Sequence, residues 1–423
     1  MPKANLPHMV MANENGDIFE HPHLRMLGAS GRNFRVPQAP EIIPTPHGTD
    51  FYILPGRHPV GCDPDGEDQR VVEEFNGQPV YAVSAFLPPA YTVLLWAPFV
   101  KMDSPPLLPL YAYASLGWTE EGFVTTAVRI DADTRQDLLG YPSDGTEDRN
   151  ADEAVNANPE NRLLAHLAHC CKVYRCPAAR NLFLGRFEAP LPISPGCNSM
   201  CVGCISLQEG EVPSTQDRIE FVPTPEEIAE IAVPHLENAP NPVASFGQGC
   251  EGEPLTQAAV VEDAIGLIRS RTTSGTLNLN TNGSRPDIIE KLFAAGLDSV
   301  RISLNSARPE MYDLYFKPVN YTFEDVIKSM EIAVGMGRFV SINYFVFPGV
   351  TDNKDEAAAL EELLERTGIQ MIQWRNLNID PDLYMDSLGW DGDGSATGML
   401  QLLDRISGKF PDLRFGYFNP NIR

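Results

Sequence analysis

The sequence lacks a run of apolar residues that could cross a membrane as a helix. An uncharged stretch extends from Gly77 to Val100, but it contains prolines at positions 79, 88, 89 and 98. Each proline lacks an N–H donor and clashes with the preceding helical turn. We therefore expect two buried strands joined at Pro88–Pro89. The first residues, MPKANLPHMVMANENG, show no apolar signal-peptide core. These features predict a cytoplasmic protein that does not contact a membrane.

Basic residues are scarce. The 423 residues include 32 Lys and Arg against 57 Asp and Glu, which gives a formal net charge of −25. A field of this sign repels phosphate backbones, so we expect no nucleic-acid partner. Hydrophobic residues make up 43% of the chain, which is enough for a sizeable core, and the length favours more than one domain.

Cysteines are also few, and all eight lie at or before Cys250. In a reducing compartment they favour metal binding or catalysis over disulfides. Three of them, Cys197, Cys201 and Cys204, form a CxxxCxxC loop in SPGCNSMCVGCIS. A structural zinc ion takes four protein ligands. A [4Fe–4S] cube held by three cysteines leaves one iron open. The spacing alone fits either a zinc site or a cluster.

The N-terminal section, residues 1–185, reads as an α+β accessory domain. Four segments have strand character and turn signals between them: FYILPG, VYAVSAFL, YTVLLWA and VTTAVRI. The acidic segment GYPSDGTEDRNADEAVNANPEN is expected to be an exposed loop. The segment NRLLAHLAHCCKVYR has helical apolar spacing and is expected to close this domain.

From residue 186 strands and helices alternate. Thr224 and Glu227 have the spacing of a capping box that opens a helix. Six strands are expected, in the segments RFEAPLPIS, PVASFG, GTLNLNTNG, DSVRISLNS, RFVSINYFVFPG and MIQWRNLNI. Strands separated by helices pair in parallel, because parallel pairing needs a long crossover. We predict an α/β fold: a partial (β/α)6 TIM-type barrel over residues 186–384 and a short C-terminal extension over 385–423. Functional groups should cluster at the C-terminal ends of the strands.

Several motifs follow these strands in order. GCEGEPL follows the second strand, NTNGS ends the third, ISLNS lies in the fourth and FPGVTD follows the fifth. With the cysteine loop, they resemble the radical S-adenosylmethionine (SAM) superfamily over roughly residues 186–384. The resemblance implies a [4Fe–4S] cluster whose open iron binds SAM. Reductive cleavage of SAM would then give a 5′-deoxyadenosyl radical that takes a hydrogen atom from a substrate. It also implies a low-potential electron donor, flavodoxin or ferredoxin.

Site residues carry over from the resemblance by position. Cys197, Cys201 and Cys204 would hold the cluster, and Gly252 and Glu253 would recognise the methionine ammonium of SAM. The remaining SAM contacts would be Thr281, Asn282, Ser303 and Asn305 at methionine and ribose, and Pro348 and Gly349 near adenine.

The chain departs from the family pattern at two positions. Gly203 stands where an aromatic residue commonly packs on adenine, and Glu251 stands where the family commonly has glycine.

Cys250 lies two residues before Gly252 and allows three interpretations. It could be a small buried hydrophobe, a fourth ligand that closes the cluster, or a catalytic residue that reacts with a substrate radical.

The segment HLAHCCKVYRC concentrates His166, His169, Cys170, Cys171 and Cys176. A second metal site near Cys170, Cys171 and Cys176, with help from Cys62, is one interpretation. A helix of ordinary core cysteines is the other, since no CxxC pair is present.

Near the end of the sixth strand, Gln373, Arg375 and Asn376 are candidate contacts to substrate or SAM. Gln373 and Arg375 share one face of the strand because side chains alternate. A polar layer inside the barrel is the alternative explanation.

We therefore expect a radical SAM enzyme acting on an unidentified protein, peptide or small molecule. The alternatives are a non-enzymatic iron–sulfur electron carrier or sensor, and a zinc-stabilised binding protein. Glu253 and the ribose-side polar residues count against both alternatives, because neither function needs a SAM pocket.

Overall fold

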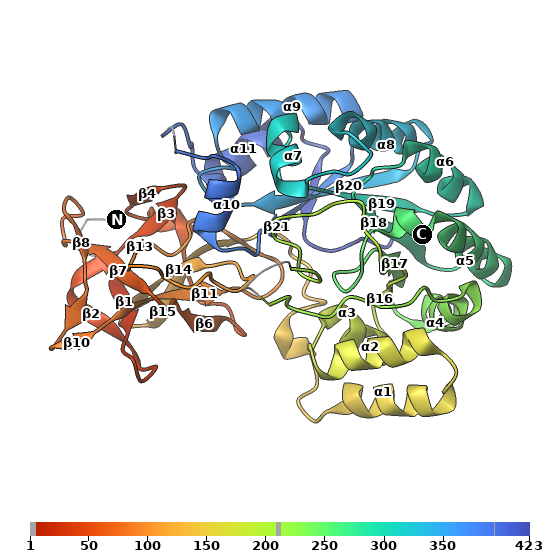
Figure 1. Ribbon diagram of the computed structural model, residues 1–423, viewed down its shortest axis with the longest axis horizontal. Coiled ribbons are helices and arrows are strands. Elements are labelled where there is room, and N and C mark those ends of the chain that lie inside the picture. The colour runs from red at the N-terminus through yellow and green to blue at the C-terminus, as the bar shows by residue number, and fades with distance from the viewer. Residues whose placement is uncertain (1–5, 209–212, 393) are drawn as a thin grey trace.

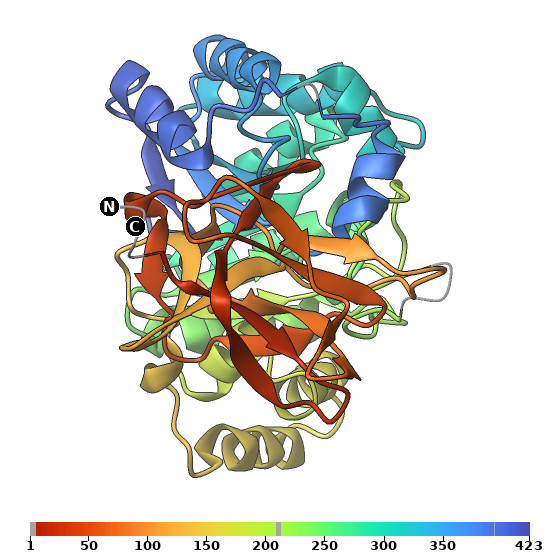
Figure 2. The same ribbon diagram turned by 90° about the vertical axis from the view of Figure 1, so that its left-hand side faces the viewer.

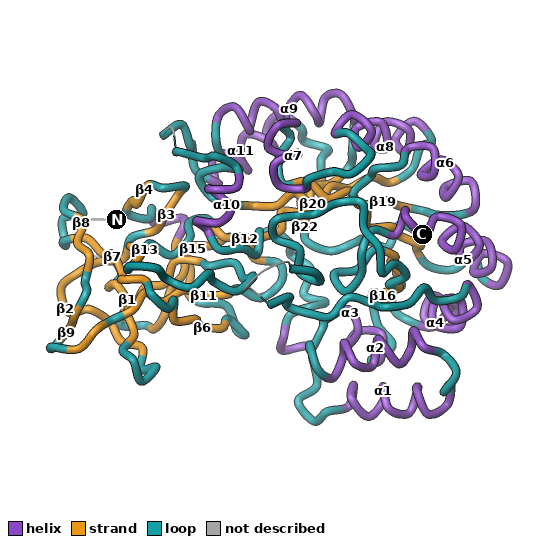
Figure 3. Tube along the Cα trace, viewed as in Figure 1, coloured by secondary structure: helices purple, strands orange, loops and turns teal. Residues whose placement is uncertain are grey.

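The computed structural model describes residues 6–208, 213–392 and 394–423. An antiparallel sheet and a parallel sheet with helices lie side by side (Figure 1). Turning the molecule by 90° brings the antiparallel part to the front (Figure 2). Strands dominate the N-terminal part, whereas helices surround the strands of the rest (Figure 3).

The N-terminal part is built from hairpins. Its main sheet has the order β12-β15-β14-β11-β1-β2-β7-β13, and β5, β6 and β8 pair with β15, β11 and β7. The four strand segments expected from the sequence lie in β6, β11, β12 and β15. The strands are β1 (His8–Ala12), β2 (Ile18–Met26), β3 (Gly28–Ser30), β4 (Asn33–Arg35), β5 (Ile42–Pro44), β6 (Asp50–Ile53), β7 (Arg57–Cys62), β8 (Gln69–Val71), β9 (Glu74–Phe75), β10 (Gln78–Pro79), β11 (Tyr81–Phe86), β12 (Tyr91–Val93), β13 (Phe99–Lys101), β14 (Ala114–Thr119) and β15 (Gly122–Arg129).

The second sheet is parallel throughout and runs in chain order from β16 to β22. All six strands expected from the sequence form, and a seventh comes from the expected C-terminal extension. The strands are β16 (Glu188–Leu191), β17 (Val243–Phe246), β18 (Thr276–Thr281), β19 (Ser299–Leu304), β20 (Phe339–Val346), β21 (Met371–Asn376) and β22 (Arg414–Gly416). The architecture is therefore α/β.

The helices of this part follow the strands. They are α4 (Pro225–Asn238), α5 (Ala258–Arg271), α6 (Pro286–Ala295), α7 (Pro309–Phe316), α8 (Phe323–Gly335), α9 (Lys354–Thr367), α10 (Pro381–Ser387) and α11 (Met399–Lys409), with a short 3₁₀ turn η4 (Pro254–Gln257). The expected capping box is confirmed: Thr224 Oγ1 accepts from Glu227 N at 3.2 Å, and the Glu227 carboxylate accepts from Thr224 N at 2.8 Å.

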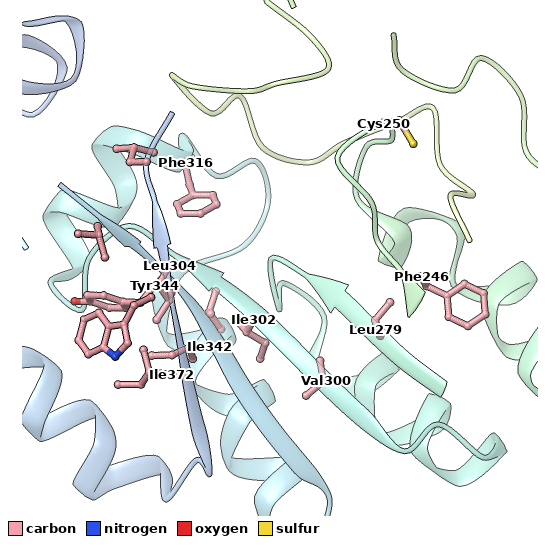
Figure 4. Packing of buried hydrophobic residues seen from close by; sticks show 14 of the residues in the cluster. Phe246, Cys250, Leu279, Val300, Ile302, Leu304, Phe316, Ile342, Tyr344 and Ile372 are labelled. Atoms are coloured by element: carbon pink, nitrogen blue, oxygen red, sulfur yellow. The ribbon is translucent and has the colours of Figure 1, made fainter. Parts of the chain in front are cut away.

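Buried aliphatic and aromatic residues fill the space between the parallel sheet and its helices. Val300, Ile302, Ile342 and Ile372 are fully buried on neighbouring strands (Figure 4). Burying each such side chain contributes about 1.5–3 kcal/mol. This packing fixes the strand order, so the strand ends stay in one place.

Three helices, α1 (Thr146–Ala157), α2 (Arg162–Lys172) and α3 (Pro177–Phe183), connect the two sheets. The acidic segment expected to be a loop forms α1, so that expectation is wrong. Its Ala151 is buried, and Glu147 pairs with Arg180 at 2.7 Å and with Arg175 at 2.6 Å. Tertiary ion pairs and a buried alanine outweigh the polar composition of the segment.

Helix α2 was expected to close the N-terminal domain, but its polar contacts reach α4. Arg162 pairs with Glu227 at 2.7 Å, and Asn161 donates to Glu227 O at 3.0 Å. The domain limits at residues 185 and 384 stay predictions.

The antiparallel sheet docks onto the ends of the parallel strands. The Asn376 amide accepts from Val93 N at 2.8 Å and donates to Tyr91 O at 2.9 Å, so it continues the backbone pairing of β12. A buried ion pair joins Arg57 of β7 to Asp380, the N-cap of α10, at 2.7 Å. Asp380 also accepts from Leu108 N at 2.9 Å.

Within residues 6–208, 213–392 and 394–423, no helix combines the length and apolar character needed to cross a membrane. Gly77–Val100 instead contains β11, β12 and part of β13.

We predict that Arg57→Met lowers the free energy of unfolding by about 3–5 kcal/mol, because Asp380 would remain buried without its cation. Denaturant titration measures this loss. Arg366→Met is the matched control. Its pairs with Glu324 and Glu331 are solvent-exposed, so its loss should stay below about 1 kcal/mol. Equal losses in the two variants would contradict a stabilising role for the Arg57–Asp380 pair.

Candidate functional site

A cavity of about 460 Å³ lies at the C-terminal ends of the parallel strands. Most of the residues proposed from the sequence meet here. Those that line the cavity are Cys197, Cys201, Cys204, Gly252, Glu253, Thr281, Asn282, Ser303, Arg375 and Asn376.

The cysteine loop follows β16 and is fixed by backbone bonds to the end of α7. Met200 N donates to Phe316 O and Val202 N donates to Tyr315 O, both at 3.0 Å. Within the loop, Cys204 N donates to Cys201 O at 3.2 Å. Residues 315 and 316 at the end of α7 therefore help to position the loop that carries the three thiols.

Burial disfavours the charged form of two of the three thiols. Burial raises the pKa of Cys197 to about 11, and burial with the neighbouring Cys197 and Cys204 raises the pKa of Cys201. Arg218 donates to Cys204 Sγ at 3.3 Å, which places a cationic side chain beside the cysteine loop. Arg218 lies 14 residues beyond Cys204, and no spacing rule in the sequence pointed to it.

The spacing of the three sulfurs tests the zinc interpretation. Tetrahedral zinc with Zn–S bonds of about 2.3 Å needs its sulfurs about 3.8 Å apart. Among the described residues, the three-residue group whose ligand atoms all lie within 4.8 Å of one another is His166, Cys170 and Cys250, and the three loop cysteines do not form such a group. In this structure the three sulfurs are therefore not all as close together as one zinc ion requires.

Gly252 is required by the close approach of two backbone segments. A Cβ atom at this position would lie 1.9 Å from Gly196 O, in the residue just before Cys197. Gly252 N donates to Ser194 O at 2.6 Å, and Glu253 N donates to Gly196 O at 2.8 Å. The glycine therefore permits the turn after β17 to pair with the start of the cysteine loop.

Glu251, which departs from the family pattern, ties the same two segments together. Its carboxylate accepts from Gln248 N at 2.7 Å, Ile193 N at 2.9 Å and Ser194 N at 3.0 Å. Burial raises its pKa to about 8. Where the family commonly has glycine, the Glu251 carboxylate accepts three backbone hydrogen bonds. These bonds hold the turn after β17 against the segment that precedes the cysteine loop.

Glu253 is almost completely buried, and burial raises its pKa to about 7. Its Oε1 accepts from the Thr281 hydroxyl at 2.5 Å and from Leu255 N at 3.0 Å, and its Oε2 accepts from Asn282 N at 2.8 Å. Oε2 accepts only one of these three hydrogen bonds, so it could accept a further one. Glu253 thus joins η4 to the end of β18, and its contact with the SAM ammonium stays a prediction.

Asn282 links β18 to the cysteine loop. Its amide donates to Asn198 Oδ1 at 2.8 Å and to Ser199 Oγ at 3.1 Å, while its Oδ1 accepts from Ser284 N at 3.0 Å. The side chain therefore supports the loop as well as lining the cavity.

Besides Cys250, four residues proposed from the sequence lie outside the cavity lining. Asn305 is buried and donates to Met311 O at 3.1 Å. Pro348 O accepts from Gly31 N at 2.8 Å, and Gly349 lies against Gly31, so this turn receives the antiparallel sheet. Gln373, also fully buried, accepts from Arg301 at 2.9 Å. Pro348 and Gly349 thus contact the N-terminal part of the chain, and Asn305 and Gln373 hydrogen-bond to buried neighbours. None of these contacts supports a direct contact with a cofactor.

The cavity also has lining residues that sequence analysis missed. They include Arg301, Asn280 and Tyr417. Arg301 lies on β19 two residues before the proposed Ser303, so the period-two alternation of strands could have identified it.

An aromatic side chain lies against the position of Gly203. A Cβ there would lie 2.9 Å from the Tyr315 hydroxyl, which leaves little room for a larger residue. Tyr315, Phe316 and Phe345 line the cavity at this side. The loss of an aromatic residue at 203 is therefore accompanied by aromatic residues from α7 and β20.

Cys250 is buried (Figure 4). It is not among the residues that line the cavity. Of the cysteines expected at a second metal site, Cys170 lies near Cys250, whereas Cys171 Sγ lies 4.0 Å from Asp148. Cys62 belongs to β7 of the antiparallel sheet. Cys176 lines the cavity at the start of α3.

Residues 191–360 match the family model of the radical SAM superfamily. An AdoMet-dependent heme synthase of Methanosarcina barkeri is 31% identical over 147 residues, which cover 33% of this chain and 37% of the relative. A probable GTP 3′,8-cyclase of Methanosarcina acetivorans is 36% identical over 141 residues, 31% of this chain and 39% of the relative. The matches thus span less than two fifths of either relative.

A crystal structure of a radical SAM methyltransferase from Sphaerobacter thermophilus aligns with a TM-score of 0.34 and 15% identity. The alignment covers 48% of this chain and 63% of the methyltransferase. The family match begins at the end of β16 and extends into α9. It includes the cysteine loop and the turn with Gly252 and Glu253. Residues 191–360 of the chain therefore form a segment that matches the radical SAM superfamily.

Proposed function

We propose that the protein is an enzyme that cleaves SAM reductively and uses the resulting 5′-deoxyadenosyl radical to abstract hydrogen from a substrate. The observation that supports this most directly is the cavity that brings three cysteines, Gly252 and the ends of β18 and β19 together. The donor set fits the cofactors. Three thiols are too widely spaced for one zinc ion, and a cationic Arg218 contacts one of them.

Cys197, Cys201 and Cys204 would hold a [4Fe–4S] cluster, which together with bound SAM supplies the radical chemistry. The chain's own residues position these groups. Glu251 and Gly252 hold the cysteine loop against the turn after β17. Arg218 contacts Cys204 Sγ and would place a positive charge beside the bound cluster. The surrounding aromatic side chains exclude water from the cavity wall.

We assign SAM recognition to the cavity wall opposite α7. Backbone and side-chain groups of Gly252, Glu253, Thr281, Asn282 and Ser303 would contact the methionine and ribose. Adenine would pack among the aromatic residues Tyr315, Phe316 and Phe345. These residues would replace the aromatic residue that the family commonly has at position 203.

For the whole chain, the parallel sheet would be the partial (β/α)6 barrel of the superfamily, extended by β22. Residues 1–185 would form the accessory domain, which docks through β12 and β7 beside the cavity. The electron would come from a low-potential donor, flavodoxin or ferredoxin, in the cytoplasm. Because the cavity also offers polar groups beyond the cysteines, it supports an enzyme better than an electron carrier or sensor.

Two arginines suggest a substrate with an anionic group. Arg301 and Arg375 both line the cavity, and neither lies within 4.0 Å of a carboxylate in the described part of the chain. Burial and the neighbouring Arg375 lower the pKa of Arg301 to about 10. Arg375 donates to Tyr417 O at 2.9 Å and stacks on the Tyr417 ring. An anion between the guanidinium groups would offset the cost of burying two like charges.

The function is tested by anaerobic reconstitution with iron and sulfide, followed by reduction and addition of SAM. We expect 5′-deoxyadenosine and about four additional iron atoms per chain. The Cys197→Ala/Cys201→Ala/Cys204→Ala variant should lose both. A reconstituted wild-type chain that binds iron but releases no 5′-deoxyadenosine would support an electron carrier instead.

Glu253→Gln should retain the iron of the cluster but weaken SAM binding by about tenfold, because a carboxylate contact contributes about 1.4 kcal/mol or more. None of the three donors to its carboxylate belongs to the cysteine loop. Iron analysis and anaerobic calorimetry with SAM measure the two effects. Glu262→Gln, on the exposed face of α5, is the control. Loss of iron from Glu253→Gln would refute the assigned role.

Arg301→Gln and Arg375→Gln should each weaken the binding of inorganic phosphate, used as a probe anion, by about tenfold or more, since each removes a charge-assisted contact. Thermal shift titration of the reconstituted enzyme with SAM bound measures this effect. Arg366→Gln, whose side chain pairs with Glu324 outside the cavity, is the control. If saturating SAM abolishes phosphate binding, the arginines serve the SAM carboxylate and the substrate assignment fails.

A further inference from the structure

Three metal-ligating side chains meet outside the cavity lining. His166 and Cys170 lie on α2, and Cys250 lies on the turn after β17. Their ligand atoms all lie within 4.8 Å of one another, and Cys170 Sγ is 3.6 Å from His166 Nε2. Both thiols are buried and His166 is partly buried. The loop cysteines 197, 201 and 204 are not part of this group.

Local structure explains why the three groups converge. A spacing of four residues places His166 and Cys170 one above the other on one face of α2. Cys250 is held opposite this face, because its carbonyl accepts from Ile219 N at 2.8 Å. Cys171, the next residue of α2, lies on the other side of the helix near Asp148. Of the two adjacent cysteines on α2, Cys170 therefore faces Cys250 and Cys171 does not.

The chemistry of these groups suits a zinc-type ion. Two cysteine sulfurs and an imidazole nitrogen are ligands that zinc prefers, and a Cys2His set leaves one coordination position for water. Both thiols are buried, so a bound divalent cation would offset the cost of burying their thiolates.

We propose that His166, Cys170 and Cys250 bind one zinc ion, at a site separate from the cysteine loop. The ion would connect α2 to the turn after β17. This turn carries Glu251 and Gly252, the two residues that follow Cys250. The ion would therefore join the helices between the sheets to the segment that supports the cysteine loop. This inference goes beyond the proposed function and does not depend on SAM cleavage.

A disulfide between Cys170 and Cys250 is the competing outcome. A disulfide would join the two cysteine sulfurs and would not involve the imidazole of His166. The position of the imidazole, 3.6 Å from Cys170 Sγ, favours a metal ion. The experiment below separates the two by counting both metal and free thiols.

The test uses the full chain with Cys197→Ala, Cys201→Ala and Cys204→Ala, which removes the proposed cluster ligands. The protein is purified anaerobically, treated with chelator and incubated with zinc. After desalting, elemental analysis should find one zinc per chain. Adding Cys170→Ser, Cys250→Ser or His166→Ala should remove that zinc, whereas adding Cys171→Ser should leave it bound.

Cobalt(II) provides a readout that needs no further variant. Titrating the cluster-free chain with cobalt should produce thiolate-to-cobalt charge-transfer absorption that saturates at one equivalent, and zinc should abolish it. Circular dichroism establishes that each variant is folded. A chain that binds no metal and has lost two thiols would show a disulfide. Iron and sulfide near four per chain in the same protein would show a second cluster. Either result would overturn the zinc site, and neither depends on the outcome of the SAM-cleavage assay.

Discussion

The site depends on one close approach between two backbone segments. Gly252 N bonds to Ser194 O at 2.6 Å, and no Cβ fits between Gly252 and Gly196. The cysteine loop begins at the next residue, Cys197, so its position follows from this pairing. The loop has no regular secondary structure to hold it, and contacts to neighbouring segments must supply its order.

Two buried carboxylates maintain that approach from opposite ends. Glu251 binds the backbone of Ile193 and Ser194, and Glu253 binds the end of β18. Burying a carboxylate is costly unless donors satisfy it. Each of these two accepts three hydrogen bonds, most of them from backbone N–H groups. The same groups thus satisfy the charge and connect β16, β17 and β18 around the cavity.

Below the cavity, polar side chains extend this arrangement into the sheet. Asn419, after β22, donates to Glu188 at 2.8 Å and accepts from Gln373 at 2.9 Å. Gln373 in turn accepts from Arg301, which lines the cavity. The C-terminal residues therefore support the floor of the site. On the outer side, the antiparallel sheet covers the ends of β20 and β21 through Gly31 and β12.

Much of the local structure was predictable because neighbouring residues decide it. The capping box at Thr224 and the six parallel strands follow from short-range patterns. The helix α1 was missed because its stability comes from distant partners of Glu147, namely Arg175 and Arg180. Similarly, spacing could suggest Gln373 and Asn376 as ligands, but their amides are occupied by Arg301 and the backbone of β12.

The sequence by itself determined the CxxxCxxC spacing, the order of the motifs along the chain and the alternation of strands and helices. Only the tertiary structure decided which cysteines come together. Cys170 and Cys250 are 80 residues apart in the chain, and they meet because α2 packs beneath the turn after β17. It also decided that Glu251 anchors the cysteine loop and that Arg218 contacts Cys204. Such contacts depend on where long-range packing places each segment, and a local pattern of residues carries no information about that placement.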